Sequence, residues 1–254
     1  MNSSPLVSTA SEIRFDQGRH YRAKIGYVLL ATEQTIQDDV MKLRPEGVGM
    51  HFARAAIPDS ITNATLGAQA DLLADCASTL LPDGSLDVVC YACTSGSLVI
   101  GEARVFKELH QGSPGAKATS LITGVIRALR ALGVRRLVVA TPYLDEINQR
   151  EAEYLEQAGF EILAISGLKL EKDSDMVRVA PDYIVEFALS LDRKDADGIF
   201  ISCGALRTLE VVGEIEARAG KPVISSNQAM IWDTLRLAGI DDKIEGYGRL
   251  LSQY

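Results

Sequence analysis

Cysteine and histidine are scarce in this chain of 254 residues, which contains four of the first and three of the second. Four cysteines are too few for a disulfide scaffold in a chain of this length, and no histidine is paired with a cysteine at the spacing of a metal site. We therefore expect no structural disulfide and no metal. The cysteines must then serve packing or chemistry.

Basic side chains and long apolar runs are also limited. The 34 acidic residues outnumber the 26 basic ones, and the resulting formal charge of -8 argues against nucleic acid as a partner, because phosphate binding needs a basic surface. No stretch approaches the roughly 18 apolar residues of a membrane helix, and the first ten residues lack the pattern of a signal peptide. The sequence thus predicts a cytoplasmic protein with no nucleic-acid or membrane partner.

Aromatic residues make up only 6% of the chain, which favours helices packed on a sheet over a β-sandwich. Short apolar runs alternate with amphipathic stretches from about Ala23 onward. Strands that are apolar throughout and separated by helices indicate a parallel sheet covered on both faces, and hence the α/β class. The predicted strands are Ile25–Ala31, Val48–Ala55, Leu86–Ala92, Arg136–Ala140, Ile162–Ser166, Gly198–Ser202 and Pro222–Ser225, and the principal predicted helices are Ala64–Leu80, Gly96–Leu109, Ala118–Leu132, Leu144–Gln157, Pro181–Leu191, Leu209–Ala219 and Gln228–Leu237.

A weak internal repeat divides this alternation into two halves. Strands ending in Ala-Thr open both halves, at Thr32 and Thr141, and a cysteine follows 61 residues after the first (Cys93) and 62 residues after the second (Cys203). We predict two pseudo-symmetric parallel-sheet lobes, residues 23–132 and 133–254, with a flexible tail over residues 1–22. The end of the chain is expected to pack back on the first lobe.

Cys93 and Cys203 both follow predicted strands, at the carboxyl edges where open α/β sheets bind ligands. A thiol at the start of a helix lies near unpaired N–H groups that favour the thiolate, so it can act as a base or a nucleophile. The small polar residues Thr94, Ser95 and Gly204 leave backbone N–H groups free to bind a carboxylate. Two such thiols facing each other could remove a proton from one face of a carbon atom and return it to the other.

Packing is the alternative interpretation of every cysteine, since a free cysteine often fills a buried space. It is the preferred interpretation of Cys76 and Cys90, which lie inside a predicted helix and a predicted strand. The matched positions of Cys93 and Cys203 favour function instead. The acidic residues Glu151, Glu153 and Glu156 are expected to form a solvated helix face.

Three segments together resemble the aspartate/glutamate racemase superfamily: Cys93-Thr-Ser-Gly-Ser97, Ala140-Thr-Pro-Tyr143, and Ser202-Cys-Gly-Ala-Leu-Arg-Thr208. The resemblance runs from about residue 23 to residue 252. It is strongest to the branch of maleate cis-trans isomerases, arylmalonate decarboxylases and ectoine-utilisation proteins. It implies two pseudo-symmetric α/β lobes, a cofactor-free enzyme, a pocket between the lobes and a homo-oligomer.

The resemblance also implies roles for individual residues. Cys93 and Cys203 match the two catalytic cysteines of the isomerases, whereas the decarboxylases have glycine at the first of these positions. Thr94, Ser95 and Tyr143 match the carboxylate-binding residues of the decarboxylases, and Gly204 would add a backbone N–H. Because this chain has both cysteines, the resemblance favours an isomerase or racemase.

Two positions depart from the maleate isomerases. Their ligand-binding asparagine falls on Glu33 here, and a second asparagine falls near Asp173 to Asp175, for which we take Asp175. A carboxylate facing maleate would repel it, whereas the same group suits a substrate that carries a cation, such as an amino acid or an ectoine-derived acid. Glu33 has an alternative role at the start of the following helix, where an acid complements the helix dipole.

The sequence therefore predicts a cofactor-independent isomerase or racemase that acts on a small carboxylic acid substrate through Cys93 and Cys203. One alternative is decarboxylation of a malonate, for which Cys203 alone would suffice. Another is a non-catalytic protein that binds a small acid.

Overall fold

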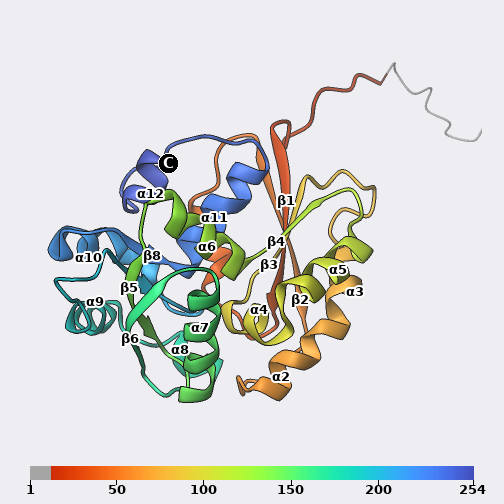
Figure 1. Ribbon diagram of the computed structural model, residues 1–254. Coiled ribbons are helices and arrows are strands. Elements are labelled where there is room, and N and C mark those ends of the chain that lie inside the picture. The colour runs from red at the N-terminus through yellow and green to blue at the C-terminus, as the bar shows by residue number, and fades with distance from the viewer. Residues whose placement is uncertain (1–12) are drawn as a thin grey trace, which may run out of the picture.

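Two four-stranded parallel sheets form the framework of the protein, whose computed structural model describes residues 13–254 (Figure 1). The first sheet has the strand order β2-β1-β3-β4 and the second has the equivalent order β6-β5-β7-β8. The predicted fold class, two pseudo-symmetric α/β lobes, is confirmed. The strands are β1 (Ala23–Leu30), β2 (Val48–Ala55), β3 (Val88–Tyr91), β4 (Lys117–Ser120), β5 (Arg136–Thr141), β6 (Glu161–Gly167), β7 (Gly198–Ile201) and β8 (Val223–Ser225).

Helices connect successive strands and cover the sheets, as parallel pairing requires. In the first lobe they are α1 (Ile36–Lys42), α2 (Asn63–Ala68), the 3₁₀ turn η1 (Gln69–Leu72), α3 (Leu73–Ser78), α4 (Thr94–Ile100), α5 (Glu102–Gly112) and α6 (Leu121–Ala131). In the second lobe they are α7 (Asp145–Gln157), α8 (Asp173–Met176), α9 (Pro181–Ser190), the 3₁₀ turn η2 (Thr208–Glu210), α10 (Val212–Ala219), α11 (Ser226–Leu237) and α12 (Arg249–Gln253).

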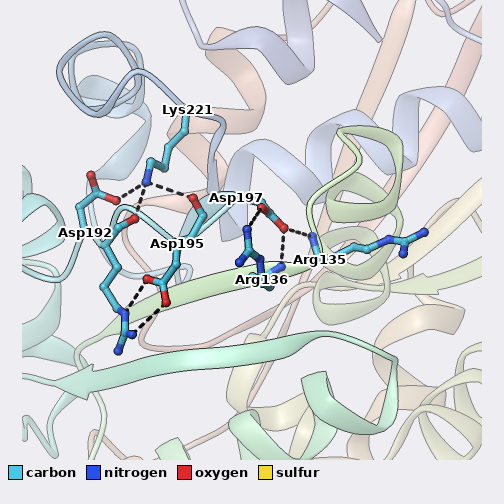
Figure 2. Close-up of polar contacts among 8 residues, drawn as sticks. Arg135, Arg136, Asp192, Asp195, Asp197 and Lys221 are labelled. Carbon is cyan, nitrogen blue, oxygen red and sulfur yellow. Dashed lines mark hydrogen bonds and ion pairs between the residues drawn. The ribbon is translucent and has the colours of Figure 1, made fainter.

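In both sheets, an aspartate before one central strand accepts a hydrogen bond from the start of the other central strand. Asp87, just before β3, accepts a hydrogen bond from the N–H of Lys24 at 2.8 Å, and Asp197, just before β7, accepts one from the N–H of Arg136 at 2.8 Å. Figure 2 shows that Asp197 also binds the Arg136 guanidinium and the N–H of Arg135. These contacts lie at the amino-terminal edge of the sheet and set the strand register, which leaves the opposite, carboxyl edge for the site.

Helices α6 and α11 pack against each other between the two sheets and join the lobes (Figure 1). The contact is close because Gly124 of α6 has no side chain; a Cβ there would lie 3.1 Å from the carbonyl oxygen of Ala229 in α11. The apolar core is continuous across this junction, since buried residues of both sheets belong to one cluster. The carboxyl edges of the sheets are therefore held at a fixed distance from one another.

Three predicted helices differ from the observed elements. The predicted helix Ala64–Leu80 is interrupted by the 3₁₀ turn η1, and Gly96–Leu109 is broken into α4 and α5 at Gly101, whose φ of +86° ends the first helix. The start of the predicted helix Ala118–Leu132 is instead the edge strand β4, which pairs with β3. Helices α8 and α12 were not predicted, because each has only four or five residues.

Residues 1–12 of the predicted flexible tail lie outside the described residues. Nearer the first strand the chain is packed: the His20 ring fills the space above Gly49, and Arg22 binds Asp242 at 2.8 Å. Ordered packing thus begins a few residues before Ala23. Among the described residues, no helix combines the length and the apolar character needed to cross a membrane.

Candidate active site

The carboxyl ends of both sheets converge on one narrow cavity with a volume of about 20 Å³, roughly the space of one water molecule. It is much smaller than the surface hollow between α6 and α7, which measures about 390 Å³. Apolar side chains form part of its wall. The cavity is lined by Leu30, Glu33, Ile36, Ile61, Ala92, Cys93, Thr94, Ser95, Tyr143, Asp173, Met176, Cys203, Gly204 and Ala205.

Cys93 lies directly after β3 and caps helix α4, because its Sγ accepts a hydrogen bond from the N–H of Gly96 at 3.2 Å. Its side chain is also 3.7 Å from the Ser95 hydroxyl. Burial raises the pKa of the Cys93 thiol to about 11, although both of these donors favour the thiolate. Cys93 is therefore a neutral thiol in the unliganded site and becomes a strong base or nucleophile once it loses its proton.

Cys203 follows β7 in the other lobe and lines the same cavity. Its backbone has a φ of +96°, a conformation rarely adopted by residues other than glycine, and its Sγ accepts a hydrogen bond from the N–H of Ala205 at 3.4 Å. Burial and the nearby Asp173 carboxyl raise the pKa of the Cys203 thiol well above its usual value, whereas the Tyr143 hydroxyl opposes this shift. The structure thus places one buried thiol from each lobe at one cavity.

Hydrogen-bond donors lie next to both thiols. Within the part of the chain that the structure describes, the N–H groups of Thr94, Ser95 and Gly204 have no acceptor. All three residues line the cavity, as the sequence motifs predicted. Gly204 must remain glycine on steric grounds, since a Cβ would lie 3.0 Å from Cγ1 of Ile36 and closer still to its Cδ1. Free backbone N–H groups of this kind are donors that can bind an anion.

Tyr143 also lines the cavity and is fully buried. Its N–H donates to the Thr141 hydroxyl at 3.1 Å, and that hydroxyl in turn donates to Asn148 at 2.5 Å, which fixes the turn after β5. Burial raises the pKa of the Tyr143 phenol, and the negative charge on either thiolate raises it further. Tyr143 is therefore a hydroxyl donor that remains protonated beside both thiols.

Glu33 is one of two buried acids at the cavity. Its Oε1 accepts the N–H groups of Thr35 and Ile36 at the start of α1, which is the role of a helix-start acid. Its Oε2 is buried and has no hydrogen-bond partner among the described residues. Burial raises the pKa of the Glu33 carboxyl, and the two N–H donors partly offset this rise.

The second acid is Asp173, not Asp175. In the short helix α8, residues two positions apart point to nearly opposite sides, so Asp173 faces the cavity and accepts the Thr32 hydroxyl at 2.6 Å. Asp175 is exposed, does not line the cavity and pairs with Arg178 at 3.4 Å. The choice of Asp175 was wrong, because sequence alone does not fix the rotation of a four-residue helix. Burial raises the pKa of Asp173.

Sequence reasoning missed several residues that support the site. Ser226, the first residue of α11, contacts both cysteine loops, and the Tyr91 hydroxyl is buried beside Gly96 and Cys93. A capping box, Ser225-Ser-Asn-Gln228, could have indicated where α11 begins. The contacts of Ser226 have no such local signal.

Glu151 is fully buried, contrary to the expectation of a solvated acidic face over residues 151–156. Its Oε1 accepts the Ser202 hydroxyl at 2.6 Å, one residue before Cys203, and burial raises its pKa to about 7. Glu153 and Glu156, on the same helix α7, are exposed as expected. A run of acidic residues does not show which of them faces the core. Helix α7 packs against β6 and α4, and this packing turns Glu151 inward.

Residues 35–251 match the family model of arylmalonate decarboxylase, and the chain belongs to this family. The arylmalonate decarboxylase of Bordetella bronchiseptica is 39% identical over 142 residues, which are 55% of this chain and 59% of that protein. The maleate isomerase of Nocardia farcinica is 29% identical over 181 residues, 68% of this chain and 72% of that protein. The resemblance inferred from the three segments is confirmed at the level of the family.

Solved structures show the same fold. The Nocardia farcinica maleate cis-trans isomerase bound to TRIS superposes with a TM-score of 0.83 at 24% identity, covering 91% of this chain and 98% of that one. A glycine-to-cysteine mutant of arylmalonate decarboxylase, in a sulfate-associated form, superposes with a TM-score of 0.77 at 32% identity, covering 90% and 99%. The two-lobed fold is thus shared with solved structures of a maleate isomerase and an arylmalonate decarboxylase.

Proposed function

We propose that this protein is a cofactor-independent isomerase or racemase that acts on a small carboxylic acid. The single observation that carries the proposal is that Cys93 and Cys203, one from each lobe, line one cavity beside the unpaired N–H groups of Thr94, Ser95 and Gly204. A decarboxylase needs only one proton donor. A second buried thiol at the same cavity, contributed by the other lobe, suits a reaction that handles a carbon atom from both sides.

In the acid/base form of the reaction, one thiolate takes the proton of the carbon next to the carboxylate. The electrons of the broken C–H bond move onto the carboxylate oxygens, where the N–H groups of Thr94, Ser95 and Gly204 stabilise them. The second thiol then gives its proton to the opposite face of the carbon. The configuration inverts, and the two thiols have exchanged their protonation states.

In the addition form, the Cys93 thiolate bonds to one carbon of an alkene that is conjugated with the carboxylate. The electron pair of the double bond moves to the neighbouring carbon, which takes the proton of Cys203, and the former double bond is now a single bond that rotates. The Cys203 thiolate then takes the proton back, the double bond re-forms in the other geometry, and the sulfur leaves with the electrons of the C–S bond. A solved mutant of the Nocardia farcinica maleate isomerase holds a covalently bound succinylcysteine intermediate, which supports this form. Both forms use the same residues, and the substrate decides between them.

We further propose that the substrate carries an amino or another cationic group, as an amino acid or an ectoine-derived acid does. Two buried acids, Glu33 and Asp173, line the cavity, and no lysine, arginine or histidine lies among its lining residues. Oε2 of Glu33 has lost its hydration without gaining a partner among the described residues, and a cation would compensate for this. A dicarboxylate such as maleate would meet two acids and no basic group.

Solvent deuterium tests the proposal. In deuterated water, we expect the protein to introduce deuterium at the carbon next to the carboxylate of an accepted amino acid, with loss of optical activity. We expect Cys93→Ser and Cys203→Ser each to abolish racemisation, because each removes one proton carrier. Full activity in either variant would contradict the two-thiol mechanism.

Decarboxylation is the second candidate, supported by the 39% identity to the Bordetella bronchiseptica enzyme. The Cys93→Gly variant separates the two, since a decarboxylase would still release carbon dioxide from an arylmalonate through Cys203. Carbon dioxide release by the unaltered protein, together with no deuterium exchange on any amino acid, would favour the decarboxylase.

A further inference from the structure

One buried hydroxyl connects the two cysteine loops. Ser226 is the first residue of α11 and is fully buried. Its Oγ lies 3.0 Å from Oγ1 of Thr94, next to Cys93, and accepts the N–H of Cys203 at 3.0 Å. A single atom in the second lobe thus contacts the loop of the first thiol and the loop of the second.

The Ser226 and Thr94 hydroxyls each have one proton to donate, and this limits how the two hydroxyls can be oriented. The Ser226 oxygen already accepts the Cys203 N–H, and its own O–H remains to be donated. We propose that Ser226 is a positioning residue that donates this proton to Thr94. The Thr94 hydroxyl proton is then free to point into the cavity, toward a bound carboxylate. This inference rests on the proposed function only in taking Thr94 as a carboxylate-binding residue.

The same serine shapes the second loop. By holding the Cys203 N–H, it supports the left-handed backbone of Cys203 and leaves the next N–H, that of Gly204, for the ligand. The neighbouring residue Asn227 completes the arrangement, because its Nδ2 donates to the Gly204 carbonyl oxygen at 2.9 Å and to Asp39 of α1 at 2.8 Å. Each of these two α11 residues therefore contacts one group of the first lobe and one of the Cys203 loop.

The inference is tested without any substrate by the alkylation of Cys93 and Cys203. Iodoacetate carries a carboxylate and iodoacetamide does not, while in both reactions the thiolate sulfur bonds to carbon and iodide leaves. Peptide mass spectrometry gives the rate at each cysteine, and the half-buried Cys76, outside the cavity, serves as the internal reference. In the unaltered protein, we expect the cavity thiols to prefer iodoacetate over iodoacetamide more strongly than Cys76 does.

Replacing Ser226 should weaken that preference. We expect Ser226→Ala to lower the iodoacetate preference at Cys93 about three- to tenfold, the range of one lost hydrogen bond. Thr94→Val should lower it at least as much, and the double variant should match Thr94→Val alone, because the serine acts through the threonine. Ser225→Ala is the control, since Ser225 caps the same helix without touching either loop.

If Ser226→Ala leaves the iodoacetate preference of Cys93 unchanged, the inference is overturned. It is also overturned if the double variant loses the product of the two single losses, because Ser226 would then act independently of Thr94. No preference in the unaltered protein would also overturn it, because Thr94 would then bind no carboxylate. If Ser226→Ala folds poorly, the nearly isosteric Ser226→Cys, with its weak S–H donor, gives the same comparison. An iodoacetate preference in the unaltered protein that falls in Ser226→Ala, together with no turnover of any substrate, would contradict the proposed function while supporting the role of Ser226.

Discussion

At the scale of single residues, two kinds of polar group line the cavity. Thr94, Ser95 and Gly204 present N–H donors on the side of the cysteine loops, while Glu33 and Asp173 present acids. Burial of an acid is costly, and the raised pKa values of Glu33 and Asp173 reflect that cost, which Arg54 only partly offsets for Glu33. A zwitterionic substrate would satisfy both kinds of group at once.

Glu33→Gln tests this pairing. We expect kcat/KM for an amino-bearing substrate to fall about ten- to hundredfold, because a hydrogen bond between two charged groups is lost. Steady-state kinetics should show no comparable loss for an analogue that lacks the amino group. Asp175→Asn is the matched control, since Asp175 is an exposed acid of α8 that does not line the cavity. Equal losses for both substrates would show that Glu33 has only a structural role.

At the scale of elements, helix α4 is built around Cys93. Gly96, the third residue of this helix, approaches both the Tyr91 ring and the thiol; a Cβ at Gly96 would overlap the Tyr91 hydroxyl and lie 3.0 Å from Sγ of Cys93. Any side chain there must displace one of the two. The φ of Gly96 does not require glycine. Glycine is therefore needed at this position because it leaves room for the Cys93 thiol.

We expect Gly96→Ala to reduce kcat about a hundredfold, since a shift of about 1 Å in a reacting group costs that much. Overpacking should also lower the free energy of unfolding by about 1–3 kcal/mol. Gly67→Ala in α2 is the matched control: its Cβ would meet nothing nearer than 3.8 Å, so activity should persist and stability should rise slightly. Urea unfolding and turnover of both variants check this, and normal kcat in Gly96→Ala would contradict it.

Helix α7 contributes a buried acid behind the Cys203 loop. Glu151 has a pKa of about 7 in the folded protein, raised by burial, against about 4.5 in the unfolded chain. Between these two values the folded state holds a proton that the unfolded state has released. The contribution of Glu151 to the free energy of unfolding therefore decreases as the pH rises from about 4.5 to 7 and stays low above that.

Glu151→Gln cannot lose a proton, so its stability relative to the unaltered protein should increase over this pH range, by at most about 3 kcal/mol. Urea unfolding at about pH 5 and about pH 8 measures the change. Glu156→Gln, on the exposed side of the same helix, should show no such pH dependence. A difference that is the same at both pH values would contradict the assignment.

At the scale of the whole molecule, α11 makes one folding unit of two lobes. Asp233 of this helix accepts the Thr119 hydroxyl at 2.7 Å and pairs with Arg127 at 2.9 Å, while Thr234 bonds to the Tyr27 hydroxyl at 2.8 Å. All three partners belong to the first lobe. The helix that follows the last strand of the second lobe thus fills the core beside the first sheet.

We expect the lobes to unfold in one transition, in which the fluorescence of Trp232 in α11 and the far-UV circular dichroism change together. Asp233→Ala should lower the free energy of unfolding by about 1–3 kcal/mol, because it leaves Thr119 and Arg127 without their buried partner. Asp71→Ala, which removes an exposed ion pair with Arg104, should leave stability nearly unchanged. Two separate transitions would contradict the single folding unit.

The sequence by itself determined the alternation of apolar strands and helices, the two halves, and the positions of Cys93 and Cys203, because these depend on the local period of the chain and on strand ends. Only the tertiary structure decided that Asp173 rather than Asp175 faces the cavity, that Lys117–Ser120 is a strand, that Glu151 is buried, and that Ser226 contacts both loops. Each of these depends on which segments far apart in the sequence pack together. A local sequence pattern does not show which distant segments pack together, because that packing depends on contacts across the whole core.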